Sequence, residues 1–245
     1  RKVAPSVQRT LFFIIKSSLL LAAQEKRRKY LDLSDISLKS VKKQIDVLEK
    51  QEQKILESFL LAKPNIRKTC VLLCLYAGLR IGEVCGLQWA DINFESNTIT
   101  IKKTILRVKN DQESLGKTKL IASLPKSSNS MRTIPVPEFI MEQFKKYKMD
   151  NSFYILSRSE KMYDPRILED SFNRMLKKCR LRHVNFHVLR HTFATRCIEA
   201  KVDIKTLSEL LGHSTIEITL KTYVHSSNHL KKESIDSLVS FMQMN

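Results

Sequence analysis

Residues 67–84 read RKTCVLLCLYAGLRIGEV and join the longest apolar run of the chain to an abrupt break. The run predicts an apolar helix over Arg67–Ala77, and Gly78 predicts the end of that helix before a second, short one. Because Arg80 follows this glycine, we expect it at a helix N-terminus, where unpaired backbone N–H groups favour an anion. For Arg80 taken alone, an ion pair with Glu83 at the helix end is the alternative.

Helices and a small sheet are predicted on either side of this segment. β-branched residues alternate along three stretches that we expect to pair as one antiparallel sheet. These are residues 97–108, 119–124 and 131–136. Apolar residues recur at helical spacing along most of the rest of the chain. The predicted helices are residues 6–30, 47–61, 137–147, 165–180 and 233–244, and most of the chain after Asn185. The predicted fold class is therefore α+β and mainly helical, with a small three-stranded antiparallel sheet.

The composition indicates a folded protein with a polyanionic partner. The chain has 245 residues, of which 42% are hydrophobic, and only five glycines and six prolines, which excludes a disordered or collagen-like chain. Its 43 Lys and Arg residues outnumber 25 Asp and Glu residues, giving a net charge of +18. That excess favours nucleic acid, although ribosomal and membrane-surface proteins share it. No apolar run approaches the roughly 20 residues that span a bilayer, so no membrane partner is expected.

The cysteines and histidines predict neither disulfides nor a metal site. Five cysteines form no CxxC pair, which argues against a disulfide framework or zinc ribbon and favours a reducing cytoplasm. His187 and His191 lie four residues apart, as zinc ligands can. The intervening residues lack the glutamate of a zinc protease motif, and no third ligand has a suitable spacing. We therefore predict no metal and no cofactor, and a structural role for His191.

The N-terminal part reads as a fragment of a small helical domain. The chain begins at Arg1 without an initiator Met, and one helix cannot bury its own apolar face, so we expect a missing N-terminal portion. Residues 34–46 have the mixed composition of a linker. The helix ends in the basic run Lys26, Arg27, Arg28 and Lys29, which reads either as a solvated helix end or as a contact to phosphate.

Cleaving a DNA phosphodiester without a metal demands several arginines, a proton donor and a hydroxyl nucleophile. Arginine forks bind phosphate oxygens bidentately and stay charged. The candidates, in chain order, are Arg80, Lys126, His187, Arg190, His213 and Tyr223. His187 and Arg190 are three residues apart, hence on one helical face. Gly212 is a C-cap signal and residues 214–217 read as a capping box, so a new helix should carry Tyr223 in its third turn.

Each candidate alone has a simpler reading. Lys126 lies in a polar turn, where a lysine is by default solvated, and Lys117 and Lys119 lie in the same sheet region. His187 could be a packed or capping histidine, and Tyr223 could fill a core with its hydroxyl pointing out. The joint occurrence of the candidates in this order argues against these readings.

Three stretches resemble the tyrosine recombinase (integrase) family in order and spacing. They read AGLRIGE at 77–83, HVLRHTFAT at 187–195 and ELLGHSTIEITLKTY at 209–223. The resemblance covers about residues 47–225. The turn segment 124–128 and the stretch Arg132–Pro135 are most similar to integrases of phages and conjugative transposons.

The resemblance implies how the site would hold a phosphate. Arg80 and Arg190 would clamp the non-bridging oxygens, with Glu83 orienting Arg80. His213 would stabilise the transition state. His187 would hydrogen-bond the phosphate or accept the proton of the tyrosine.

The resemblance also implies the covalent chemistry. Tyr223 would attack to give a 3′-phosphotyrosyl link, and Lys126 would protonate the 5′-hydroxyl leaving group. A phenol has a pKa of about 10, far below that of an alkyl alcohol, so its phosphoester forms and reverses readily. Cleavage and rejoining would then need neither ATP nor metal.

By resemblance, the protein would be a site-specific recombinase for excision and integration of a mobile element. Its partners would be double-stranded DNA, further copies in a tetramer on DNA, and accessory excision or DNA-bending proteins, in the bacterial cytoplasm. Residues 1–33 would be part of a core-type DNA-binding domain, 47–230 the catalytic domain, and 231–245 a helix docking on a neighbouring subunit, or on its own domain. A type IB topoisomerase and a non-catalytic DNA-binding relative are the alternatives.

Overall fold

The computed structural model describes residues 3–26, 33, 36, 45–110, 117–124, 131–223, 239 and 242. The chain divides into two compact units, Arg1–Gln44 and Ile45–Asn245. In the described ranges, no helix is both long enough and apolar enough to cross a membrane. The predicted helix at 233–244 falls almost wholly outside these residues.

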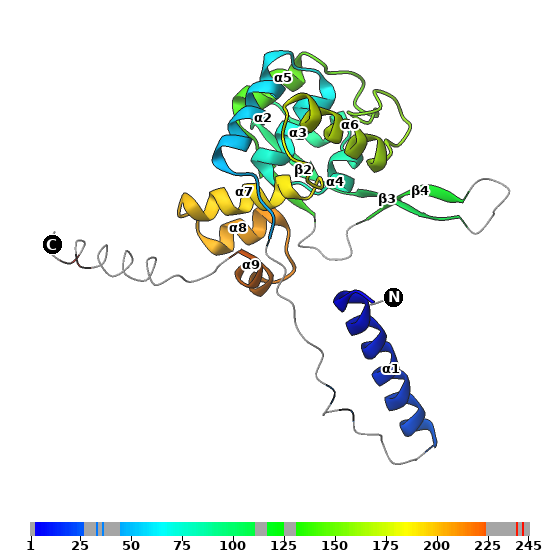
Figure 1. The fold of residues 1–245 in the computed structure, drawn as a ribbon. Coiled ribbons are helices and arrows are strands. Elements are labelled where there is room, and N and C mark those ends of the chain that lie inside the picture. The colour runs from blue at the N-terminus through cyan, green and yellow to red at the C-terminus, as the bar shows by residue number, and fades with distance from the viewer. Residues whose placement is uncertain are drawn as a thin grey trace. The chain divides into compact units, whose positions relative to one another are not determined.

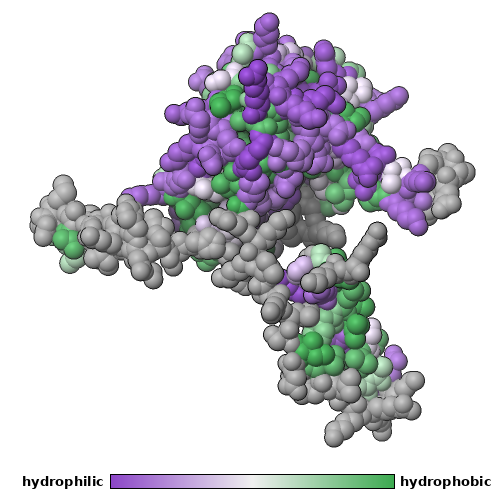
Figure 2. All heavy atoms as spheres, viewed as in Figure 1, coloured by the Kyte–Doolittle hydropathy of each residue, from purple (hydrophilic) through white to green (hydrophobic). Residues whose placement is uncertain are grey.

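The first unit contains one described helix, α1 (Pro5–Lys26), where the sequence predicted residues 6–30. Most of its apolar side chains are exposed, and hydrophobic side chains gather along the helix in Figure 2. Phe13 is the most open of them, with 70% of its surface exposed. Arg27, Arg28 and Lys29 of the basic run lie outside the described residues, as does the side chain of Lys26.

The core of the second unit is built around α3 (Ile66–Ala77), which packs against α2 (Lys50–Ala62), α5 (Glu138–Lys145) and α7 (Val188–Glu199) (Figure 1). Every residue from Lys68 to Leu75 is buried, so the apolar run in the sequence is the central helix. The side chain of Asn65 caps its start by accepting a hydrogen bond from the Lys68 backbone N–H at 3.1 Å.

Gly78 ends α3 with a left-handed backbone, φ 65°, as the sequence predicted. A Cβ there would lie 2.5 Å from Cδ1 of Phe193, so the position also lacks room for a side chain. The chain then enters α4 at its N-cap residue, Arg80. The other helices among the described residues are α4 (Ile81–Gly86), the short 3₁₀ helix η1 (Trp89–Asp91), α6 (Pro165–Lys178), α8 (Ile204–Leu211) and α9 (Ile216–Tyr223).

The strands form two small antiparallel sheets. The first is three-stranded in the order β1-β2-β5, and the second is the hairpin β3-β4, which projects away from the helices (Figure 1). The strands are β1 (Ile92–Asn93), β2 (Thr98–Ile101), β3 (Thr104–Lys109), β4 (Thr118–Ser123) and β5 (Arg132–Pro135). In register, Ile99 faces Ile134 across β2 and β5, and Leu106 faces Ile121 across β3 and β4.

The predicted membership of the sheet was wrong, although a three-stranded antiparallel sheet is present. Residues 97–108 are not one strand, because the chain changes partners between β2 and β3. Lys102 at this break pairs with the buried carboxylate of Asp91 at 2.8 Å, and Lys103 donates to Gln88. These contacts hold the break against the η1 segment, so β2 pairs with β5 while β3 continues into the hairpin.

Candidate active site

The described site residues come from five separate elements that meet around the start of α4. Arg80 and Glu83 belong to α4, Arg132 begins β5, and α7 supplies the histidines and arginine of its first turns. The C-terminal end of α8 and the helix α9 close the site. The residues brought together are Arg80, Glu83, Arg132, His187, Arg190, His191, His213 and Tyr223. Lys126 lies outside the described residues.

Arg190 is the most deeply buried arginine of the site, with 1% of its surface exposed. Its Nη1 donates to the Gly78 carbonyl and its Nη2 to the Leu211 carbonyl, both at 2.8 Å. Burial, together with the charge of Arg80, lowers the pKa of Arg190 to about 10. The two carbonyls fix the guanidinium between the ends of α3 and α8, and the guanidinium also hydrogen-bonds the side chain of Tyr223.

The carboxylate of Glu83 bridges two guanidinium groups. Arg80 donates from Nη1 at 2.7 Å, and Arg132 donates from Nη1 and Nη2 at 3.1 and 2.9 Å. The backbone N–H of Arg80 also donates to this carboxylate at 2.9 Å. Burial alone would raise the pKa of Glu83, but Arg132 and Arg80 hold it at about 2. The ion pair between Arg80 and Glu83 is therefore present in the structure.

Arg132 is a site residue to which the sequence assigned no role. It is almost fully buried, and its Nε donates to the Leu210 carbonyl at 2.7 Å, which ties β5 to the end of α8. The stretch Arg132–Pro135 stood among the motifs of the resemblance, and that was the available signal. A buried arginine at the start of a strand requires a carboxylate partner, which the sequence alone did not identify.

His213 connects the end of α8 to α9, because its Nδ1 lies 2.8 Å from Oγ1 of Thr219. Partial burial and the charges of Arg190, Arg80 and Arg132 lower the pKa of His213 to about 4. The pKa of His187, the N-cap residue of α7, is lowered as well. Partial burial and then the neighbouring His191 and Arg190 lower its pKa to about 4. Both imidazoles are therefore neutral at pH 7 in the free protein.

Tyr223 ends α9, and its hydroxyl lies 2.8 Å from Nδ1 of His191. Burial raises the pKa of Tyr223, whereas the charge of Arg190 opposes that shift. His191, for which the sequence predicted a structural role, is thus in contact with Tyr223. Spacing placed His191 on α7, but its contact depends on how α9 packs against that helix.

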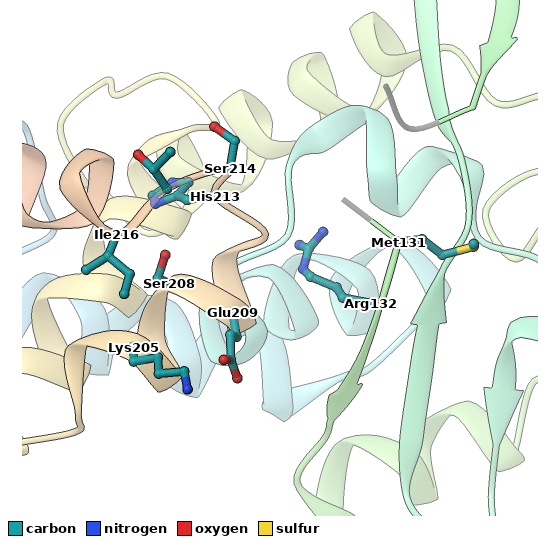
Figure 3. Close-up of a pocket in the computed structure, with 9 residues that line it drawn as sticks. Met131, Arg132, Lys205, Ser208, Glu209, His213, Ser214 and Ile216 are labelled. Carbon is teal, nitrogen blue, oxygen red and sulfur yellow. The ribbon is translucent and has the colours of Figure 1, made fainter. Parts of the chain in front are cut away.

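A pocket of about 410 Å³ opens beside Arg132 and His213 (Figure 3). Lys205 and Glu209 of α8 line one part of it, and Ile216 at the start of α9 lines another (Figure 3). Arg132 reaches from β5 toward α8 beside this opening, so solvent comes close to the charged centre of the site. Among the described residues, no group of three or more His, Cys, Asp or Glu side chains could hold a metal ion.

Comparisons with known proteins identify the family to which the chain is similar. A model described as the phage integrase family matches residues 45–229. The chain is similar to a tyrosine recombinase XerC-like protein of Caldanaerobacter subterraneus subsp. tengcongensis, with 32% identity over 216 residues, covering 81% of this chain and 55% of that protein. It is also similar to the transposase from transposon Tn916 of Enterococcus faecalis, with 30% identity over 201 residues, covering 73% of this chain and 47% of that protein. The chain thus spans about half the length of these curated relatives.

A solved structure also has this fold. It is the Tn1549 transposon integrase in complex with a circular intermediate DNA, with a TM-score of 0.74 and 22% identity, covering 96% of this chain and 80% of that one. That likeness agrees with the mainly helical α+β class predicted from the sequence. Since the family model matches most of the chain, this protein belongs to the phage integrase family, the tyrosine recombinases that its motifs resemble.

Proposed function

We propose that this protein is a site-specific DNA recombinase that cleaves and rejoins DNA for the excision and integration of a mobile element. The observation that carries the proposal is the position of Tyr223. Its hydroxyl lies in a half-buried site, where the positive charges of Arg190 and Arg80 act to lower the pKa of Tyr223. A hydroxyl nucleophile among fixed guanidinium groups suits attack on a phosphodiester anion.

In the proposed reaction, Arg80 and Arg190 bind the non-bridging oxygens of the scissile phosphate. The phenolic oxygen of Tyr223 attacks phosphorus, forming a 3′-phosphotyrosyl bond. The bond to the 5′ oxygen breaks, and that oxygen takes a proton from Lys126. His213 donates a hydrogen bond to the phosphate in the transition state. A 5′-hydroxyl that attacks the phosphotyrosyl bond reverses these steps and rejoins the strand.

The charge balance of the site supports binding of an anion. One carboxylate, Glu83, faces the guanidinium groups of Arg80 and Arg132, and Arg190 adds a third positive charge. A phosphodiester with one negative charge would offset part of that excess. His187 lies at the rim of the site, where it would hydrogen-bond the phosphate.

The proposed substrate and partners follow from the relatives and the charge. The net charge of +18 suits double-stranded DNA, and one relative is a transposase. We propose a homo-tetramer on DNA, aided by accessory excision or DNA-bending proteins, in the bacterial cytoplasm and nucleoid.

The domain boundaries are part of the same proposal. Residues 47–230 are assigned to the catalytic domain, supported by the compact unit that begins at Ile45 and by the family match over 45–229. Residues 1–33 are assigned to part of a core-type DNA-binding domain, 34–46 to the linker, and 231–245 to a helix that docks on a neighbouring subunit.

A covalent-trapping assay tests the function. A nicked duplex carrying the element end is incubated with wild type or with Tyr223→Phe in the presence of EDTA. Because of the nick, the short fragment that carries the released 5′-hydroxyl diffuses away. Rejoining is then prevented, and the covalent intermediate accumulates. Wild type should form an adduct that survives denaturation, and Tyr223→Phe should bind the DNA without forming one. Binding of the DNA by wild type with no adduct would contradict the proposal.

A further inference from the structure

The Tyr223 hydroxyl has two hydrogen-bonding neighbours on α7, the imidazole of His191 and the guanidinium of Arg190, and of these His191 is the one that can accept a proton. The 2.8 Å distance between Nδ1 and the phenolic oxygen is that of a well-formed hydrogen bond. The centroids of the two rings lie 5.6 Å apart at an interplanar angle of 59°, so the rings are tilted relative to each other and not stacked. The ring of His187 contacts the ring of His191 edge to face, with the two ring centroids 4.5 Å apart.

The surroundings of His191 favour an imidazole that accepts a proton from the hydroxyl. Four titratable or charged groups face it: Tyr223 from α9, His187 and Arg190 from α7, and Asp46 from the segment before α2. Burial and then Arg190 lower the pKa of His191, whereas Asp46 opposes the shift. The ring is therefore neutral at pH 7, and a neutral ring whose Nε2 carries the hydrogen presents Nδ1 as an acceptor. Asp46 would stabilise the imidazolium that forms when the ring takes a proton.

We propose that His191 positions the hydroxyl of Tyr223 and takes its proton during DNA cleavage. This inference rests on the proposed recombinase function and adds a catalytic residue to it. In the step, the phenolic O–H bond breaks, the proton passes to Nδ1, and the electron pair of the phenolic oxygen forms the bond to phosphorus. The bond from phosphorus to the 5′ oxygen breaks at the same time, and the 5′ oxygen receives its proton separately from Lys126.

This assignment divides the two histidines of the HVLRH motif between two tasks. His187, the N-cap residue of α7, would hydrogen-bond the phosphate. His191, one turn further along α7, serves the nucleophile. After cleavage, the imidazolium can return its proton to the phenolic oxygen when the strand is rejoined, so one residue serves both directions.

The test compares wild type with His191→Asn on a duplex in which sulfur replaces the bridging 5′ oxygen at the scissile phosphate. A thiolate leaves without a proton, so this substrate removes the contribution of Lys126 and reports only on the nucleophile. The Oδ1 atom of asparagine can accept the hydroxyl hydrogen bond but cannot take the proton. We expect cleavage by His191→Asn to be about 100-fold slower than by wild type at pH 7, the usual size of a general-base contribution.

The pH profile separates proton transfer from a structural defect. Wild type should cleave the sulfur substrate at a nearly constant rate between pH 7 and pH 9, because His191 is already neutral. His191→Asn should gain about 10-fold per pH unit, because Tyr223 must then ionise by itself. A variant that had merely lost its fold would not recover at higher pH.

The matched control is His183→Asn, the same substitution at an exposed histidine outside the site. It should keep the wild-type rate and profile. The inference is overturned if His191→Asn cleaves the sulfur substrate at the wild-type rate at pH 7, or if its pH profile on that substrate has the wild-type shape. In each of those cases, an adduct formed by wild type and absent from Tyr223→Phe would still leave the recombinase function standing.

Discussion

At the residue scale, the bridge from Glu83 to Arg80 and Arg132 controls the geometry of the site. The side chains of Glu83 and Arg132 are only 6% and 7% exposed. Water therefore cannot solvate the charge of one of them when the other is removed. Removing one partner of a buried ion pair leaves an uncompensated charge, which typically costs about 3–5 kcal/mol. Arg80 would lose its fixed orientation together with that bridge.

We therefore expect Arg132→Ala to lower the free energy of unfolding by about 3 kcal/mol. Urea denaturation measures this. Lys145→Ala is the matched control, because it removes an exposed ion pair with Glu142 and should cost less than about 1 kcal/mol. Equal effects of the two substitutions would contradict the buried bridge.

His213 should respond to pH and to DNA. Its folded pKa of about 4 lies below the value of 6.5 expected in an unfolded chain. The unfolded state therefore binds more protons between pH 6.5 and 4, so His213 lowers the stability as the pH falls through that window and has no such effect at pH 7.

NMR titration of the His213 imidazole, assigned with His213→Gln, should give a midpoint near pH 4 in the free protein. Bound DNA should raise it, because a phosphate favours the imidazolium. The Tyr223→Phe variant prevents cleavage during the measurement. A midpoint that DNA leaves unchanged would place His213 away from the phosphate.

The sequence indicated candidate site residues, but it assigned no role to Arg132 and did not show all the contacts. Arg80, His187, Arg190, His213 and Tyr223 were predicted as a set from ordered motifs, and the structure brings them together. The hydrogen bond from His191 to Tyr223 joins residues 32 positions apart. Helical spacing within α7 contains no information about the packing of α9, so this contact needed the structure.

At the element scale, helices were easier to predict than strand pairing. The apolar run and Gly78 predicted α3 closely because a buried helix and its cap are local features. The sheet depended on a break at Lys102 that is held by Asp91, a residue 11 positions earlier. Alternation of β-branched residues predicted the strands but could not show where the chain changes partners.

The junction of α8 and α9 gives the prediction at this scale. Gly212 ends α8 with φ 62°, and a Cβ there would lie 2.8 Å from Nη1 of Arg132. Gly212→Ala should therefore lower the free energy of unfolding by more than about 1 kcal/mol, as measured by urea denaturation. It should also slow cleavage, because α9 carries Tyr223.

Lys201→Gly is the control for backbone conformation alone. Lys201 already has φ 59°, so glycine relieves strain there and should stabilise the protein or leave it unchanged. A harmless Gly212→Ala would show that the junction of α8 and α9 tolerates a side chain beside Arg132.

At the scale of the whole molecule, the net charge of +18 predicts how DNA binding depends on salt. Each phosphate neutralised on duplex DNA should contribute a slope of about −0.9 in a plot of log affinity against log salt concentration. Fluorescence anisotropy across a salt series measures this slope. A flat response would contradict binding through the phosphate backbone.

The central claim is that Tyr223 becomes covalently joined to DNA, and mass spectrometry of the trapped adduct tests it most directly. The wild-type adduct is digested with nuclease and protease, and the modified peptide is sequenced. We predict a nucleotide joined through its 3′ phosphate to the phenolic oxygen of Tyr223. A nucleotide on any other residue, or one joined through a 5′ phosphate, would contradict the account.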